Sequence, residues 1–353
     1  MGKTYKDSGV DIDANEAFVR AIRSAVERTH GPDVIPVPGG FAGEIALKQK
    51  NSLFARQYKD PVLVASTDGV GTKLKIAFKM DKHDTVGFDL VAMSVNDLIT
   101  NGARPLFFLD YVAFSGVSNE TQVDVVRGIA QACLDADCAL LGGERAELPG
   151  FYKKGEYDLA GFAVGIVDRS KRVNGSKVRP GDSVIGIASS GLHSNGYSLA
   201  RSVLLEDAEL KLNERIDELG CTLGQELLRP TCIYARAIQS LLKHYKIKSG
   251  VRAIANITGG GIIENLPRVL PKGCGARISK SAWPKQPIFG LIQRLGDVDE
   301  DEMYRVFNMG LGMVLVVPPT YAQSVIRQLA RLGHPAHVIG RVKRGPNVID
   351  LVD

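Results

Sequence analysis

Hydrophobic and polar positions in the first half of the chain alternate between short apolar runs and amphipathic stretches. Apolar runs bounded by turn-forming residues predict four strands, at 61–67, 106–114, 138–142 and 158–167. Apolar residues at helical spacing predict helices at 16–30, 89–101 and 119–136, and Ser118 is a suitable N-cap for the last of these. Residues 34–43, rich in Pro and Gly, predict a loop.

The second half shows the same mixture after a polar break at 168–182, which carries a Pro180-Gly181 turn. We expect strands at 184–188, 311–317 and 336–342, and helices from Tyr197, near 286–295 and at 320–332. The break predicts two domains, 1–169 and 170–353. Because strands and helices do not follow a regular βαβ series, the pattern favours an α+β fold with layered sheets.

The composition excludes several classes of function. The 353 residues carry a net charge of only +5 and no long basic run, which suits a small anionic substrate better than nucleic acid. The apolar run at 311–317 is too short to span a bilayer, and the N-terminus has no apolar signal core. Five cysteines without a C-x-x-C pair argue against a disulfide framework, so we expect a cytoplasmic protein that binds neither nucleic acid nor membrane.

The loop at 66–73 is the most informative stretch, because it places a carboxylate, two glycines, a hydroxyl and a lysine after a strand. Asp68 can hold a hard cation, while the amides of Gly69 and Gly71 can approach a phosphate. Lys73 can neutralise that phosphate, and Thr72 completes the predicted nucleotide site. An ordinary turn is the alternative for this loop alone.

Further acids occur at similar places. Asp97 lies within a helix, Asp110 in an apolar strand, and Glu144 where a strand opens into a glycine loop. Together with Asp68 they predict one Mg²⁺ site, with Asp110 either a further ligand or a residue that only positions the others, since Mg²⁺ prefers oxygen ligands and uses few carboxylates plus substrate phosphates. Asn101 lies one turn beyond Asp97, so both can serve the nucleotide. For each acid alone, a helix cap or an Arg partner is the competing interpretation.

Two loops in the second half carry further candidates. His193, Ser194 and Asn195 lie between a strand and a helix. His193 could move a proton near neutral pH or simply fix the loop, and helix capping is the alternative for Ser194 and Asn195. The turn of Thr258, Gly259, Gly260 and Gly261 precedes a short helix, where backbone amides favour an anion; a flexible hinge competes with that interpretation. No Walker A or dinucleotide fingerprint occurs, so ATP would bind through another architecture.

These motifs, in this order, resemble the phosphoribosylformylglycinamidine cyclo-ligase family, also called aminoimidazole ribonucleotide synthetases. The matching segments span nearly the whole chain: 4–12, 68–75, 94–97, 105–111, 142–144, 189–199, 257–261, 264–271 and 302–308. The resemblance implies ATP-dependent cyclisation of formylglycinamidine ribonucleotide to aminoimidazole ribonucleotide, ADP and phosphate in purine synthesis.

The resemblance also implies a homodimer whose N-terminal domains share a β-barrel, with ATP and Mg²⁺ bound near the interface. It implies catalytic roles for Lys73, His193 and Asn195, and ATP binding by Lys6, in an N-terminal arm that folds over the nucleotide. Ser194 and the turn at 258–261 would bind the substrate phosphate.

Two positions depart from the family pattern. Arg145 replaces a usual Thr after Glu144, and Asn256 replaces a usual His before the turn. Asparagine cannot shuttle a proton at pH 7. A catalytically impaired nucleotide-binding homologue, or a related phosphoryl-transfer enzyme of the same superfamily, is therefore the alternative function.

Overall fold

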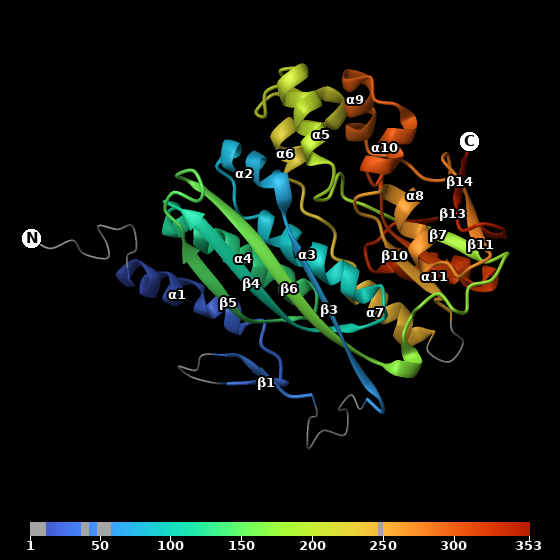
Figure 1. Ribbon diagram of the computed structural model, residues 1–353, viewed down its shortest axis with the longest axis horizontal. Coiled ribbons are helices and arrows are strands. Elements are labelled where there is room, and N and C mark those ends of the chain that lie inside the picture. Colours follow the sequence, from blue (N-terminus) through green and yellow to red (C-terminus); the bar gives the residue numbers. More distant parts are fainter. Residues whose placement is uncertain (1–11, 37–41, 48–57, 246–249) are drawn as a thin grey trace, which may run out of the picture. The chain divides into compact units, whose positions relative to one another are not determined.

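The computed structural model describes residues 12–36, 42–47, 58–245 and 250–353. The chain forms two compact units, one of Met1–Leu98 with Arg104–Ser170 and one of Ile99–Ala103 with Lys171–Asp353 (Figure 1). The small segment 99–103 thus groups with the C-terminal unit, although it is far from it in sequence.

The first unit is built on a four-stranded sheet in the order β3-β6-β4-β5 (Figure 1). Its strands are β3 (Pro61–Gly69), β4 (Arg104–Ser115), β5 (Ala139–Glu147) and β6 (Glu156–Asp168). All four were predicted, each slightly shorter than found. β4 and β5 are parallel, because α4 (Asn119–Asp135) carries the chain back between them, and the other pairs are antiparallel. A small hairpin joins β1 (Val34–Ile35) to β2 (Glu44–Ile45).

Helices cover one face of this sheet. They are α1 (Ile12–Glu27), α2 (Leu74–Met80), α3 (Val86–Ile99) and α4. Leu90 of α3 lies against Gly161 of β6, and α1 packs on α4 and β5. Ser118 caps α4 as predicted, accepting a hydrogen bond from the Thr121 amide at 3.1 Å.

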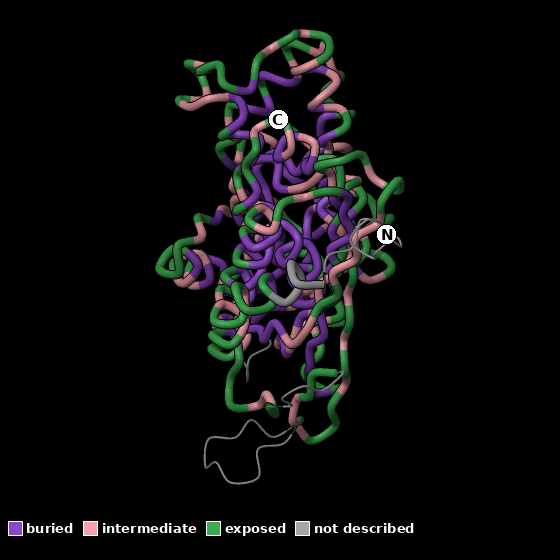
Figure 2. Tube along the Cα trace, turned by 90° about the vertical axis from the view of Figure 1, so that its left-hand side faces the viewer, coloured by how far each residue is buried: buried purple, intermediate pink, exposed green. Residues whose placement is uncertain are grey.

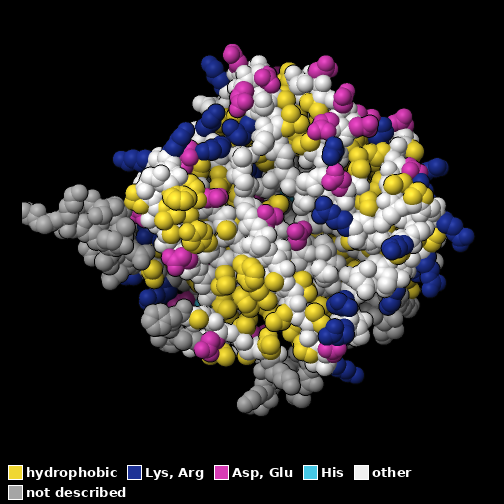
Figure 3. Space-filling model, in the orientation of Figure 1, with side chains coloured by type: hydrophobic (Ala, Val, Ile, Leu, Met, Phe, Trp, Pro, Cys, Tyr) yellow, Lys and Arg dark blue, Asp and Glu magenta, His cyan; other side chains and the backbone are white. Residues whose placement is uncertain are grey.

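The opposite face of the sheet is exposed and largely apolar. Because side chains alternate along a strand, Leu63, Tyr111 and Phe162 all point to this side, with 58%, 39% and 41% of their surface exposed. Figure 3 shows a hydrophobic patch over β3, β4 and β6. A sheet face of this kind is typical of an interaction surface.

The second unit contains a six-stranded sheet in the order β10-β12-β7-β13-β11-β14. Its strands are β7 (Ser183–Ala188), β10 (Ala253–Asn256), β11 (Cys274–Ser279), β12 (Leu311–Val317), β13 (Ala336–Arg344) and β14 (Ile349–Val352). All seven residues of the central β12 are buried, as expected for its unbroken apolar run. Figure 2 shows the buried stretches gathered in the interior of the fold.

Seven helices accompany this sheet in the described part of the unit: α5 (Tyr197–Arg201), α6 (Leu223–Leu227), α7 (Ala235–His244), α8 (Gly261–Asn265), α9 (Pro287–Gly296), α10 (Glu300–Val306) and α11 (Ala322–Arg331). A π-helix, Ser202–Asp207, continues α5, and β8 (Arg215–Ile216) pairs with β9 (Cys221–Thr222). The predicted helices at 286–295 and 320–332 correspond to α9 and α11. β10, β11, β14 and α7 were not predicted, because they are short or masked by polar neighbours.

The mixed α and β, two-domain architecture is confirmed. The finer expectation of a β-barrel is not, because the described strands of one chain form an open four-stranded sheet. Within the described ranges, no helix combines the length and the apolar character that crossing a bilayer requires.

Candidate active site

Four residues in the first unit form one row across the sheet. Asp68 of β3 pairs with Gly161 of β6, which pairs with Asp110 of β4, which in turn pairs with Gly143 of β5. Residues paired in register point to the same face, so both aspartates lie on the helix-covered side. The sheet therefore aligns two acids that are 42 positions apart in sequence.

Asp68 is joined on this side by Asp97 of α3. Burial raises the pKa of the Asp68 carboxyl, a hydrogen bond from the Gly69 amide at 2.8 Å opposes that rise, and the negative charge of Asp97 adds to it. Half-buried Asp68 and exposed Asp97 are thus close enough to repel. Such a pair favours a cation, which would relieve the repulsion.

The Asp110 carboxyl turns towards the neighbouring strand β5. Its Oδ1 lies 2.2 Å from where a Cβ at residue 143 would stand, so the carboxyl leans over Gly143 towards β5 and away from Asp68. Only glycine at 143 leaves room for it. Burial raises the pKa of Asp110 to about 7. The carboxyl therefore packs over β5, an arrangement that suits a positioning role, and metal binding by Asp110 stays a prediction.

Glu144 does not join the pair within one chain. It is in register with Tyr111, one position beyond Gly143, and therefore points to the exposed face. Its Oε1 accepts a hydrogen bond from the Arg145 amide at 3.1 Å. In the described ranges, no three His, Cys, Asp or Glu side chains are arranged to hold a metal. The structure thus brings Asp97 to Asp68 but does not bring Glu144 to them within one chain, and a metal role for Glu144 stays a prediction.

The unusual Arg145 has a structural explanation. Its guanidinium lies over the rings of Phe18 and Phe114, at 4.8 and 4.7 Å from their centroids, and bonds to Asn119 and Gln122. It thereby fastens α1 and α4 to β5, on the face away from Glu144. Burial lowers the pKa of Arg145.

Lys73 has an unexpected position. Its side chain is fully buried, and its Nζ contacts both oxygens of Asp89 at 2.8 Å. The sequence analysis missed Asp89, although a carboxylate in the apolar stretch that became α3 was a usable signal. Desolvation lowers the pKa of Lys73 and the Asp89 charge opposes that change. Lys73 thus anchors the end of the loop to α3, and its contact with a phosphate stays a prediction.

The rest of the loop remains open. Gly71 has φ +70° with nothing near its missing Cβ, and Thr72 is exposed. Asn101 belongs to the other unit, where its carbonyl accepts a hydrogen bond from the Val173 amide at 3.0 Å. Lys6 lies outside the described residues.

In the second unit, the two predicted loops meet at the same end of the strands of the sheet. β7 and β10 flank β12 and both run antiparallel to it, so both end beside its first residues. Gly196 and Gly261, one from each loop, each lie against Phe307. Residues more than 60 positions apart are thus brought together, as expected when two strands end on the same side of a sheet.

The loop at 189–196 is fixed by neutral hydrogen bonds. Buried Asn308 donates to the Gly191 carbonyl at 2.9 Å and accepts from the Gly310 amide at 2.8 Å and the Ser189 hydroxyl at 3.1 Å. Gln286 donates to the Ser189 carbonyl at 2.7 Å. Neither amide side chain was predicted, because only the fold brings them to the loop.

His193 belongs to this network. It is buried, has a left-handed backbone with φ 59°, and its Nε2 accepts a hydrogen bond from the Ser190 amide at 3.2 Å. A ring nitrogen that accepts an N–H carries no proton. The geometry therefore matches the loop-fixing alternative better than proton transfer.

Asn195, unlike His193, has a side-chain donor outside this hydrogen-bond network. Its Nδ2 is buried and has no hydrogen-bond partner in the described structure. The N-cap of α5 is Gly196, which uses no side chain, so neither Ser194 nor Asn195 caps the helix. An unsatisfied buried amide group in a candidate site is typical of a ligand contact.

The glycine turn is shaped by close packing. At Gly261 a Cβ would stand 1.9 Å from the Tyr304 carbonyl oxygen, and its φ is +56°. Asn265 donates back to the carbonyls of Thr258, Gly259 and Gly261, at 3.3, 3.1 and 2.7 Å. A turn held in this way is rigid, which argues against the hinge alternative.

Comparison with known proteins finds a family match for each half of the chain. Residues 52–167 match the family described as AIR synthase related protein, N-terminal domain, and residues 179–352 match its C-terminal domain. The phosphoribosylformylglycinamidine cyclo-ligase of Syntrophotalea carbinolica is 54% identical over 341 residues, 97% of this chain and 95% of that one. That of Acetivibrio thermocellus is 52% identical over 96% of each. The chain belongs to the phosphoribosylformylglycinamidine cyclo-ligase family. The family resemblance seen in the sequence is thereby confirmed.

Solved structures support the fold of this cyclo-ligase family member. Thiamine-monophosphate kinase from Stenotrophomonas maltophilia superposes with a TM-score of 0.66 at 17% identity, covering 94% of this chain and 95% of that one. Hydrogenase maturation protein HypE in complex with ATP gives 0.63 at 16% identity, covering 95% and 91%. At these identities the likeness shows the shared architecture alone.

Proposed function

We propose that the protein cyclises formylglycinamidine ribonucleotide to aminoimidazole ribonucleotide, converting ATP to ADP and phosphate, in purine biosynthesis in the cytoplasm. The observation that carries the proposal is the identity of about one half to cyclo-ligases over nearly the whole chain. ATP phosphorylates the formyl oxygen and thereby activates the formyl carbon. An amidine nitrogen then attacks that carbon, and phosphate leaves.

The Asp68 and Asp97 pair fits a Mg²⁺ ion. Burial, and to a smaller extent the nearby charge of Asp97, raises the pKa of Asp68, and the two carboxylates are an oxygen donor set of the kind that Mg²⁺ uses with phosphates and water. When bound, the ion would neutralise charge on the transferring phosphoryl group. Glu144 remains a proposed ligand of this ion only if a second copy of the chain brings it to the pair.

The loop residues would then position ATP. We expect the backbone at Gly71 and the exposed Thr72 to contact phosphate oxygens, with Gly69 held beside them by the hydrogen bond from its amide to Asp68, while the buried Lys73–Asp89 pair holds the loop end in place. Lys6 and Asn101 remain proposed ATP ligands.

The edge of the second sheet would hold the substrate. Asn195 supplies a donor whose hydrogen-bonding capacity the protein leaves unused, and Ser194 and the rigid turn at 258–261 lie at the same edge. Holding one molecule with both reacting ends close lowers the entropic barrier to ring closure. His193 would help to fix this loop through the hydrogen bond that it accepts from the Ser190 amide.

The homodimer is part of the same proposal. The exposed face of the first sheet, with Leu63, Tyr111 and Phe162, carries an apolar patch that could pair with a second copy (Figure 3). Phe162→Glu should convert the dimer to monomer in analytical ultracentrifugation, whereas a monomeric wild type would refute the dimer.

The activity is tested by incubating the protein with MgATP and formylglycinamidine ribonucleotide and following ADP and imidazole formation. Asp68→Asn and Asp97→Asn should each lower kcat/KM about 100-fold or more, because metal-held charge stabilises the transition state by several kcal/mol. Asp124→Asn, an exposed carboxylate on α4, is the matched control and should change little.

The alternative function, a catalytically impaired nucleotide-binding homologue, predicts a different result in this assay. Asn256, buried at the end of β10, is the observation that motivates it. Tight ATP binding without turnover by the wild type would favour that function, and the identity to cyclo-ligases favours the enzyme.

A further inference from the structure

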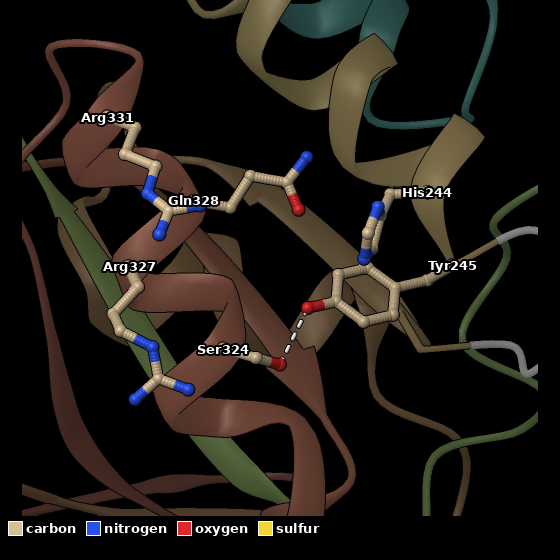
Figure 4. A pocket seen from close by; sticks show the side chains of 6 residues that line it. All are labelled: His244, Tyr245, Ser324, Arg327, Gln328 and Arg331. Atoms are coloured by element: carbon tan, nitrogen blue, oxygen red, sulfur yellow. Dashed lines mark hydrogen bonds between the residues drawn. The ribbon is translucent and has the colours of Figure 1, made fainter.

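A separate hollow lies in the second unit, between α7 and α11. It has a volume of about 430 Å³ and is lined by His244, Tyr245, Ser324, Arg327, Gln328 and Arg331 (Figure 4). That volume is within the range of small-molecule pockets. α11 starts just after β12 ends, at the edge of the sheet away from the loops at 189–196 and 258–261. The hollow is therefore distinct from the proposed substrate site.

The lining is positively charged. Arg327 and Arg331 are four positions apart on α11 and therefore on one face of the helix. Both are exposed, and neither makes a hydrogen bond or ion pair with another residue in the described ranges. None of the described residues that line the hollow is acidic, and His244 adds an imidazole from the opposite wall.

The floor of the hollow is already fixed. Ser324 donates to the Tyr321 carbonyl at 2.9 Å, so Tyr245 must be the donor in its 2.6 Å bond to Ser324 (Figure 4). Gln328 donates to the Ser240 hydroxyl at 3.1 Å, which leaves its amide oxygen to accept from a ligand hydroxyl. The neutral groups are thus satisfied or oriented, and the two guanidinium groups are the parts of the lining left without a counter-charge.

We propose that this hollow binds a small phosphate-bearing anion that also carries a hydroxyl group. Guanidinium groups offer paired N–H donors that match the oxygens of a phosphate, and two of them on adjacent turns can share one dianion. The Gln328 oxygen would receive the hydroxyl group.

The test is equilibrium dialysis at low ionic strength with inorganic phosphate and, separately, ribose 5-phosphate, using the full-length protein. The double variant Arg327→Gln/Arg331→Gln is compared with Lys272→Gln/Arg277→Gln, which removes the same charge from exposed positions at β11. Thermal melts establish that both variants fold.

We expect the first variant to lose one binding site, or to weaken it at least tenfold, while the control keeps it. Gln328→Leu should weaken ribose 5-phosphate binding and leave inorganic phosphate unchanged. Activity with MgATP should persist in every variant, so the result does not depend on the proposed reaction. Equal binding by the two double variants would overturn the site, and tighter binding of malonate than of phosphate would overturn the phosphate assignment.

Discussion

The two candidate loops, at 68–73 and at 189–196, are fixed by different forces. The first ends in a buried ion pair, Lys73 with Asp89, and carries one carboxylate, Asp68, close enough to Asp97 of α3 for the two to repel. The second is held by neutral hydrogen bonds from Asn308 and Gln286 and contains an unsatisfied amide, Asn195. The first is therefore suited to a cation and its phosphates, and the second to a polar substrate.

The contrast predicts different sensitivities to charge. A loop fixed by ionised groups depends on pH and on the presence of both partners. A loop fixed by amides and hydroxyls depends on the number of hydrogen bonds that it retains.

Breaking the ion pair should have the largest effect. Lys73→Met leaves Asp89 buried without its partner and should lower the free energy of unfolding by about 3 to 5 kcal/mol, measured by urea denaturation. The double variant Lys73→Met/Asp89→Leu should recover much of that loss. If the single and double variants were equally unstable, packing rather than charge would explain the effect.

Asp110 tests whether the first unit is stabilised by titrating groups. Its pKa of about 7 lies above the value in an unfolded chain, near 3.9, so its stabilising contribution is complete below about pH 4 and is lost as pH rises through 7. Asp110→Asn should therefore remove a pH dependence of at most about 4 kcal/mol between pH 4 and 8. Urea denaturation across that range measures it, and Asp124→Asn should retain the wild-type slope.

Asn308 tests the neutral network in the second unit. Asn308→Ala removes three hydrogen bonds and leaves the Gly310 amide unsatisfied, which should cost about 2 to 3 kcal/mol of stability. Unlike the change at Asp110, this loss should not vary between pH 5 and 8. A marked pH dependence would show that a titrating group also holds this loop.

Asn195 should give the smallest change in stability. Because its Nδ2 makes no hydrogen bond within the described structure, Asn195→Ala should shift the free energy of unfolding by less than about 0.5 kcal/mol. Turnover should nevertheless fall, with KM for the ribonucleotide raised and KM for ATP unchanged. A destabilised variant with normal kinetics would instead make Asn195 a structural residue.

Much of the fold was predictable from local patterns. The strands at 61–67 and 311–317 were found because each is an apolar run with clear boundaries, and Ser118 because capping is a local interaction. β10 and α7 were missed, since short elements in the second unit gain their stability from neighbours distant in sequence.

The candidate site was predictable in composition but not in geometry. Glycines and acids at strand ends marked the candidate loops, but the sequence did not show that Lys73 is buried against Asp89, that Asp110 leans over Gly143 or that Glu144 points to the other face. The direction of each side chain depends on strand register, and one position of register decides which face of a sheet it reaches.

The sequence by itself determined the family, the two-part organisation and the loops that carry chemistry, because these follow from motif order and local periodicity. Only the tertiary structure decided which charges meet. It buried Lys73 against Asp89, brought Asp97 to Asp68 and separated Glu144 from both. Electrostatic interaction depends on distance and solvent exposure in three dimensions, and neither can be measured along the chain.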